Sequence, residues 1–339
     1  MRKRFRETVG IVAVTTVATV AIGVLTAPAA AATPLITELG PLPGQYSASA
    51  EGVNDDGVVV GTVYGSTVTA VRWDPAGTPT PLAAWPGDTE SNANAINDGG
   101  AVAGQSSASS SSRHAVRWEA DGTIKDLGTL PGGRPSSAQA INDDGVVAGY
   151  AYNAAYDQRA VRWAVDGTPT VLNPLPGDTQ SYAYGINNAG VVVGTSSTSL
   201  GALRPVRWDT DGTVTALGTA TGAALDISDD GVVSGYTGHT KATTWAADGT
   251  PTILTPAPGH DGGTVRITDD GVIHGASGTT GGTTRWHAAV WQADGTPTLL
   301  GDLDATGTSV ARSLNSAGVA VGWATRDGQT RAVRWTPAG

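Results

Sequence analysis

Cysteine is absent from this chain of 339 residues, and Phe and Met occur once each. Disulfide bonds and thiolate metal sites are therefore excluded, so packing and hydrogen bonding must hold the fold together. The formal charge of −10 disfavours contact with phosphate backbones, and we expect no nucleic-acid partner. Two signatures of catalysis are also missing, because neither a Gly-x-Ser-x-Gly elbow nor a phosphate-binding glycine loop is present.

The first 32 residues differ from the rest of the chain. A basic start at residues 2–6 is followed by an apolar stretch at 11–27 and by alanines at 29–32. This order is typical of a cleaved signal peptide. We therefore predict a signal peptide at 1–32, a secreted, extracellular protein of bacterial origin, and a single domain at 33–339 with no membrane contact after cleavage.

A sequence repeat of about 40–47 residues occurs seven times after the predicted signal peptide. Each repeat contains one polar turn that ends in Gly and, further on, one Trp. The turns are residues 54–57, 97–100, 142–145, 187–190, 228–231, 268–271 and 315–318. The tryptophans are Trp73, Trp118, Trp163, Trp208, Trp245, Trp291 and Trp335. A period of this size with four short strands is the signature of a propeller blade.

The runs between the turns are short and rich in Val, Thr, Ile, Tyr and Trp, which favours strands over helices. The second run of a repeat is apolar at every position, as in 58–60 and 191–193, and this pattern indicates a strand covered on both faces. The third run carries a regularly spaced Arg, which we expect to pair with turn carboxylates between blades. These residues are Arg72, Arg117, Arg162, Arg207 and Arg334.

The phase of the repeats predicts how the ring closes. The chain ends after a third run, 332–335, whereas residues 35–39 match a fourth run without the other three. We therefore predict an all-β fold, a seven-bladed β-propeller of four-stranded antiparallel blades, closed by the N-terminal strand completing the last blade. Such closure hides the edges that an open β-solenoid, the alternative architecture, would expose.

Three segments of the repeat carry a resemblance to a known family. They read SYAYGIN at 181–187, HAVRW at 114–118 and LGTLPG at 127–132. In these segments the mature chain resembles the HAF-repeat family of bacterial extracellular proteins, with Val where the family name has Phe, and Arg at 159 and 331 in place of the leading His. The resemblance implies a secreted repeat protein and supplies no catalytic residues.

The inner end of each repeat offers candidate site residues. Two positions before the aliphatic residue that precedes each turn, the side chain varies, whereas the position upstream is Ala in six of the seven repeats. We expect the alanines to pack near the axis and the varied residues to surround a channel mouth. The varied residues are Glu51, Asn94, Gln139, Tyr184, Leu225, Val265 and Arg312.

The connections between the second and third runs, and those between blades, diverge from repeat to repeat, and they share one rim of the predicted ring. Variable loops on a constant scaffold often bind ligands, although loops free of packing constraints also drift. We predict that the mouth, with Tyr150, Tyr152 and Tyr182, receives a glycan or peptide, because Tyr offers an apolar face and a hydroxyl. The alternative is that these side chains only fill the gap between blades.

Metal binding is not expected. The Asp-rich turns lack the further spaced acids of a calcium loop, and ordinary turn chemistry explains them. Zinc or acid–base chemistry could use the clustered histidines, but no ligand spacing accompanies them. These are His239, His260, His274 and His287. His274 lies in a buried run, where we expect it to hydrogen-bond within its blade.

We therefore expect a monomeric, secreted binding module without a cofactor, rather than an enzyme. The alternative is an extracellular glycoside hydrolase or lyase on the same scaffold, which would need a carboxylate pair. The candidates for that pair are Glu51, Glu90, Asp226 and Asp304. A structural cell-surface protein without a small ligand is a third possibility.

Overall fold

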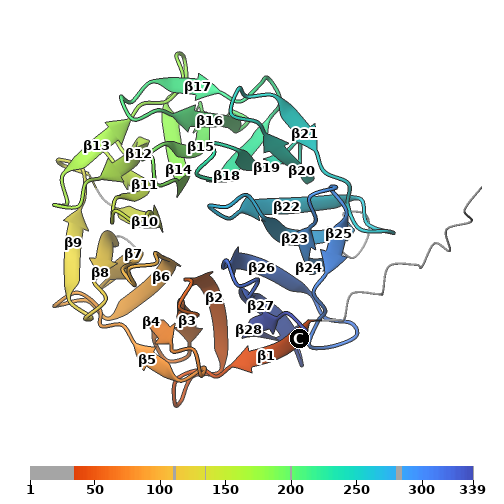
Figure 1. Ribbon diagram of the computed structural model, residues 1–339. Coiled ribbons are helices and arrows are strands. Elements are labelled where there is room, and N and C mark those ends of the chain that lie inside the picture. The colour runs from red at the N-terminus through yellow and green to blue at the C-terminus, as the bar shows by residue number, and fades with distance from the viewer. Residues whose placement is uncertain (1–33, 110–111, 134, 199–200, 280–284, 339) are drawn as a thin grey trace, which may run out of the picture. The chain divides into compact units, whose positions relative to one another are not determined.

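The computed structural model describes residues 34–338 except 110–111, 134, 199–200 and 280–284. These residues form seven four-stranded antiparallel sheets around a common axis, which confirms the predicted seven-bladed β-propeller (Figure 1). The predicted signal peptide, 1–32, lies outside the described residues. Within the described residues, no helix is long and apolar enough to cross a membrane.

Each blade runs from an inner strand beside the axis to an outer strand at the perimeter (Figure 1). The inner strands are β2 (Ser47–Val53), β6 (Glu90–Ile96), β10 (Ser136–Ile141), β14 (Gln180–Ile186), β18 (Gly222–Ile227), β22 (Gly262–Ile267) and β26 (Ser309–Leu314). The second strands are β3 (Val59–Tyr64), β7 (Val102–Ser107), β11 (Val147–Tyr152), β15 (Val192–Ser197), β19 (Val233–Thr237), β23 (Ile273–Thr279) and β27 (Ala320–Arg326).

The third and outer strands complete the blades. The third strands are β4 (Val68–Trp73), β8 (His114–Trp118), β12 (Gln158–Trp163), β16 (Arg204–Trp208), β20 (Lys241–Trp245), β24 (Arg285–Trp291) and β28 (Gln329–Thr336). The outer strands are β5 (Pro79–Pro81), β9 (Ile124–Gly128), β13 (Pro169–Leu172), β17 (Val214–Ala216), β21 (Pro251–Ile253), β25 (Pro297–Leu299) and, for the last blade, β1 (Leu35–Leu39).

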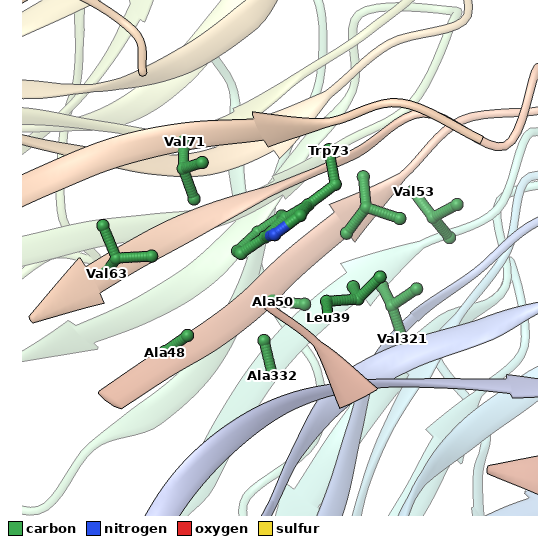
Figure 2. Close-up of a cluster of buried hydrophobic side chains, with 10 residues drawn as sticks. Leu39, Ala48, Ala50, Val53, Val63, Val71, Trp73, Val321 and Ala332 are labelled. Atoms are coloured by element: carbon green, nitrogen blue, oxygen red, sulfur yellow. The ribbon is translucent and has the colours of Figure 1, made fainter. Parts of the chain in front are cut away.

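Ring closure follows the prediction. Strand β1 pairs antiparallel with β28, with Leu35 opposite Thr336 and Leu39 opposite Ala332. Figure 2 shows the apolar cluster that joins this last blade to the first: Leu39, Val321 and Ala332 pack near Trp73 and Ala50. Strands β1 and β28 are therefore joined by sheet pairing, and the last blade shares a core with the first.

The repeated Trp packs between blades and makes a hydrogen bond to the connection between them. Each of these seven side chains is almost fully buried between blades. Where its partner is defined, the indole Nε1–H donates to a backbone carbonyl in the connection that leads into its own blade, as from Trp73 to Gly40 (2.7 Å) and from Trp118 to Ala83 (2.8 Å). A buried indole needs such a partner for its N–H. The Trp thus fixes the connection between blades as well as filling the core.

The repeated Arg crosses between blades, but it mostly meets carbonyl oxygens rather than the carboxylates that we expected. The guanidinium of Arg72 donates to the carbonyl oxygen of Gly100 (2.7 Å), and that of Arg162 donates to Gly190 (3.0 Å). Carboxylate contacts occur within a blade, to the residue just after the third strand, from Arg117 to Glu119 and from Arg207 to Asp209. The planar guanidinium suits a pair of carbonyls at a Gly-ended turn, which the repeat pattern alone does not reveal.

Two rims follow from the topology. We call the rim that carries the turns between inner and second strands the turn rim, and the opposite rim, with the connections between blades, the link rim. On the turn rim, Asn side chains tie neighbouring turns together: the amide of Asn97 donates to the carbonyl oxygen of Asn142 (2.9 Å), and that of Asn142 donates to Asn187 (3.1 Å). The Asn residues in the turns therefore have a structural role.

Candidate functional site

A β-bulge places the varied residues beside the axis. In six of the seven inner strands the pairing with the second strand slips by one residue, for example between Ala50 and Gly52. The residue at the slip has no partner, and a bulge of this kind re-aims its side chain. The bulge residues are Glu51, Asn94, Gln139, Tyr184, Leu225 and Arg312.

The sixth blade lacks this bulge, and here the predicted equivalence is wrong. Val265 pairs with Gly275, as Ala50 pairs with Gly61 in the first blade, and it is buried. Val265 is therefore the counterpart of the packed alanines rather than of the varied residues. Because one residue is missing, Arg266 follows at once and reaches the axis.

The axial channel contains a cavity of about 460 Å³, which we call the turn-side chamber. Its lining extends along the inner strands to the turn residues Asp55, Asp98 and Asp143. The larger chamber thus faces the turn rim, whereas we had favoured the link rim. Its polar wall contains Glu51, Asn94, Gln139, Tyr184, Asp226, Arg266, His274 and Arg312.

A second cavity of about 170 Å³, the link-side chamber, is lined by residues that come earlier along the same inner strands, such as Thr264 and Val310. Tyr184, Arg266 and Arg312 line both chambers. We call these three residues the waist. The predicted mouth is therefore a constriction inside the channel, with a different chamber on each side.

Acidic side chains surround the turn-side chamber in an ordered belt. The Oδ1 atom of Asp98 accepts a hydrogen bond from the backbone N–H of Asp55 (2.9 Å). In the same way, the Oδ1 atom of Asp143 accepts one from the backbone N–H of Asp98 (3.1 Å). Burial and repulsion from Asp229 and Asp226 raise the pKa of Asp269 to about 7. The Asp residues of the turns are therefore explained by these hydrogen bonds between neighbouring turns, and they make the entrance of the chamber acidic.

Inside the turn-side chamber, two pairs of an Arg and a carboxylate lie close together without a hydrogen bond. Arg266 Nη1 lies 3.9 Å from Asp226 Oδ2, and Arg312 Nε lies 3.6 Å from Glu51 Oε2. Both distances exceed hydrogen-bonding range. Burial raises the pKa of Asp226 to about 6, although Arg266 acts in the opposite direction.

Local backbone chemistry makes room for Asp226. A Cβ at Gly185 in the neighbouring inner strand would lie 2.9 Å from Asp226 Cα and 3.0 Å from its Oδ1. Because the first of these contacts is to a backbone atom, a side chain at position 185 requires the neighbouring strand to shift. Sequence reasoning named Asp226 only as one of several acids and missed Arg266. The signal was present: the position after the bulge is Gly or Ala in the first four blades and Asp, Arg and Ser in the last three.

The predicted tyrosines form one stack. The rings of Tyr150 and Tyr182 lie 4.6 Å apart between centroids, those of Tyr182 and Tyr184 lie 4.3 Å apart, and Tyr152 meets Tyr150 edge-on at 6.1 Å. Tyr150, Tyr152 and Tyr182 line neither chamber, and only Tyr184 reaches the channel. The stack therefore packs the third blade against the fourth, as the gap-filling alternative supposed, and ligand contact by its first three members stays a prediction.

The histidines do not act as one group. His239 is exposed, whereas His260 and His287 stack with centroids 5.3 Å apart. The Nδ1 atom of His260 contacts Ser277 Oγ (3.0 Å), and that of His287 contacts Asp302 (2.7 Å). Within the described residues, no three His, Cys, Asp or Glu side chains are arranged to hold a metal ion.

His274 is buried and lines the turn-side chamber. Burial lowers its pKa to about 4, so the ring is neutral. Its Nε2 atom lies 3.4 Å from the carbonyl oxygen of Arg312, so the contact crosses to the next blade rather than staying within its own. Among the described residues, its Nδ1 atom has no hydrogen-bond partner.

Of the four candidate catalytic acids, the structure brings two together. Glu51 and Asp226 line the same turn-side chamber. Glu90 and Asp304 line neither chamber, and Asp304 lies near Arg326 instead. Among these four candidates, the two acids that share a chamber are therefore Glu51 and Asp226.

Comparisons with known proteins bear on the fold. No family model and no curated protein matches the chain, so the HAF-repeat resemblance stays a prediction. Among solved structures, a streptogramin B lyase aligns over 90% of this chain and 98% of its own, with a TM-score of 0.60 and 11% identity.

Two further solved structures are similar in the same way. A catalytically inactive variant of virginiamycin B lyase from Staphylococcus aureus, with quinupristin, aligns over 89% of this chain and 99% of its own, with a TM-score of 0.60 and 15% identity. An oligogalacturonate lyase from Vibrio parahaemolyticus aligns over 89% and 93%, with a TM-score of 0.59 and 11% identity. At such identities the likeness establishes the propeller scaffold and no activity.

Proposed function

We propose that this protein is a secreted, monomeric binding module of the HAF-repeat type that holds a glycan in its turn-side chamber. The observation that carries the proposal is the wall of fixed amides. Asn94 Nδ2 donates to the carbonyl oxygen of Ala138 (2.7 Å), and Gln139 Nε2 donates to Ser137 Oγ (2.8 Å). Neither amide oxygen has a hydrogen-bond partner among the described residues, and both residues line the chamber, so these oxygens can accept from ligand hydroxyls.

The rest of the chamber supports the same ligand class. Tyr184 supplies a flat apolar ring with a hydroxyl, which suits the mixed polar and apolar faces of a pyranose. Glu51 adds acceptor oxygens. The volume of about 460 Å³ falls within the range of small-molecule sites. A peptide side chain is the other ligand that we consider.

A glycan array on the purified protein tests the proposal, followed by calorimetry with the best ligand. We expect Asn94→Ala and Tyr184→Ala to weaken binding, and the exposed, outer-strand variant Thr80→Ala to leave it unchanged. If no glycan binds, or if Asn94→Ala and Tyr184→Ala both bind like the unmodified protein, the turn-side chamber is not a glycan site.

A second candidate function, a glycoside hydrolase or lyase, is favoured by one observation. Asp226, whose pKa is raised to about 6, shares the chamber with Glu51, so a proton donor and a second carboxylate are present. Incubation of array-positive glycans with the protein, read by product analysis, tests this role. An enzyme would lose turnover in Asp226→Asn and Glu51→Gln while retaining binding, whereas a binding module would release no product.

A further inference from the structure

The link-side chamber differs in chemistry from the chamber below the waist. Its lining includes two basic residues, Arg266 and Arg312, and no acidic residue. The other large side chains on its wall are Leu225, Val265, Val310 and Tyr184. The channel is thus divided into an acidic, polar chamber and a basic one with aliphatic walls.

The two guanidinium groups are available for a new partner. Among the described residues, neither donates a hydrogen bond, and their nearest carboxylates lie at 3.6 and 3.9 Å in the turn-side chamber. The Nε atom of Arg312 is buried without any hydrogen-bond partner. A buried donor left in this state is destabilising unless a ligand or water completes it.

The position of the pair is a consequence of the fold. Arg312 is the bulge residue of β26, and Arg266 reaches the axis because β22 lacks a bulge. The two side chains come from neighbouring blades and are close enough that Arg266 contributes to lowering the pKa of Arg312. Two guanidinium groups side by side match the two oxygens of one carboxylate.

We propose that the link-side chamber binds a carboxylate that carries a short branched aliphatic group. The carboxylate lies between Arg266 and Arg312 at the waist, and the aliphatic group contacts Leu225 and Val310. Such a group can come from a free short-chain acid or from the C-terminal residue of a peptide. This site shares the waist residues with the proposed glycan site, but the rest of its wall lies on the other side of the waist.

The test titrates the purified protein with N-acetyl-L-valine and with N-acetyl-L-valinamide, followed by calorimetry and by protein NMR. We expect the acid to bind and the amide to fail, because the amide lacks the charge that the arginines require. Isovalerate and an acetylated tripeptide ending in Val then distinguish the two sources: equal binding of isovalerate indicates a free acid, and tighter binding of the tripeptide indicates a peptide terminus.

Variants locate the site. Arg266→Gln and Arg312→Gln should each weaken binding of N-acetyl-L-valine at least about tenfold, because each removes a charge-assisted hydrogen bond. Asp226→Asn should tighten it, since a competing negative charge near Arg266 is lost. Asn94→Ala, which should impair the glycan site, should leave it unchanged, so the two proposals can fail separately.

Three results would overturn the carboxylate site. These are binding of the amide as well as the acid, no binding of any of the carboxylates, and binding unaffected by both Arg variants. Thermal unfolding of each variant serves as the folding control. Neither guanidinium donates a hydrogen bond to the rest of the described chain, so the Gln variants should fold as the unmodified protein does.

Discussion

At the scale of single residues, the channel is shaped by one position of the inner strand, the residue that follows the bulge or, in the sixth blade, its counterpart. The first four blades have Gly52, Ala95, Ala140 and Gly185 there, and the later blades have Asp226, Arg266 and Ser313. Small residues on one side leave space for the charged ones on the other. At this position of the inner strands, charged side chains therefore occur only in the fifth and sixth blades, and Gly185 is the last small residue before them.

Gly185→Ala should lower the free energy of unfolding by about 1–3 kcal/mol, because its Cβ would overlap the backbone of Asp226 at 2.9 Å. Gly40→Ala is the matched control, since a Cβ at that position meets nothing within 4 Å and Gly40 has no positive φ. Urea denaturation of the two variants compares them. Equal stabilities would show that the inner strands can shift freely at this point.

The two raised carboxyl pKa values predict a pH dependence of stability. Asp226 and Asp269 titrate near 6 and 7 when folded and near 3.8 when unfolded, so the folded chain holds their protons more tightly. Stability from these groups therefore increases as the pH falls from about 8 to about 5. His114, whose pKa is raised mainly by Asp126, acts in the same direction, because its contribution is lost as the pH rises through its folded pKa.

Calorimetric melting of the protein across this pH range checks the prediction, with Asp226→Asn/Asp269→Asn as the comparison. The double variant should show a flatter profile, and it should be more stable than the unmodified protein at pH values above both folded pKa values. Because Asp269 is exposed at the turn rim, solvent screens part of the repulsion, and the larger share should come from Asp226. A profile unchanged by both substitutions would contradict the assignment.

At the scale of the element, the turns between inner and second strands connect the blades through Asn. Asn142 is buried, accepts from the N–H of Val146 (2.9 Å) within its own turn, and donates to the carbonyl oxygen of Asn187 (3.1 Å) in the next. In the fifth blade Ser228 keeps the first bond, because its Oγ accepts from Val232 N–H (3.2 Å). The side chain thus combines a local and an interblade hydrogen bond.

Asn142→Ala should lower the free energy of unfolding by about 1–3 kcal/mol, because it leaves buried partners without hydrogen bonds. Asn142→Ser should lose less, since it can restore the bond within the turn as Ser228 does. Chemical denaturation of both variants measures the difference. Should the Ser variant be no better than Ala, the interblade bond would account for the whole effect.

The elements were predictable from the sequence to the extent that they repeat. The strands, the positions of the turns and the ring closure all follow from the spacing of the repeated residues, because every blade is packed between its neighbours by the same residue types. The bulges were not predictable, since a residue added to one strand alters register without altering the apolar pattern. The missing bulge in β22 is therefore what shifted Val265 from the predicted mouth into the core and left Arg266 unnoticed.

At the scale of the whole molecule, the site depends on seven blades meeting at one axis. Glu51 and Asp226 are far apart in sequence and share a chamber only because the ring is closed. A single sequence indicates most of the side chains that point to the axis, but their distances across it depend on the ring geometry. This is why the ring was predicted in full, whereas the division into an acidic and a basic chamber was not.

Closure itself can be tested with two leucines in equivalent places. Leu39 and Leu172 are both buried near the end of an outer strand, but Leu39 belongs to β1, which closes the ring, and Leu172 to β13, which is held by the chain at both ends. Replacing either by Ala should lower the free energy of unfolding by about 2–5 kcal/mol through the cavity that it leaves. The two variants should differ in local opening.

Strand β1 can separate from β28 without disturbing other strands, so Leu39→Ala should lower the free energy of this local opening. Hydrogen exchange followed by mass spectrometry should then show faster exchange in β1 and β28 of Leu39→Ala, while Leu172→Ala exchanges its β13 amides only through larger openings. If the two variants exchange alike, the last blade is no weaker than the others, and closure by the N-terminal strand is as firm as a covalent connection.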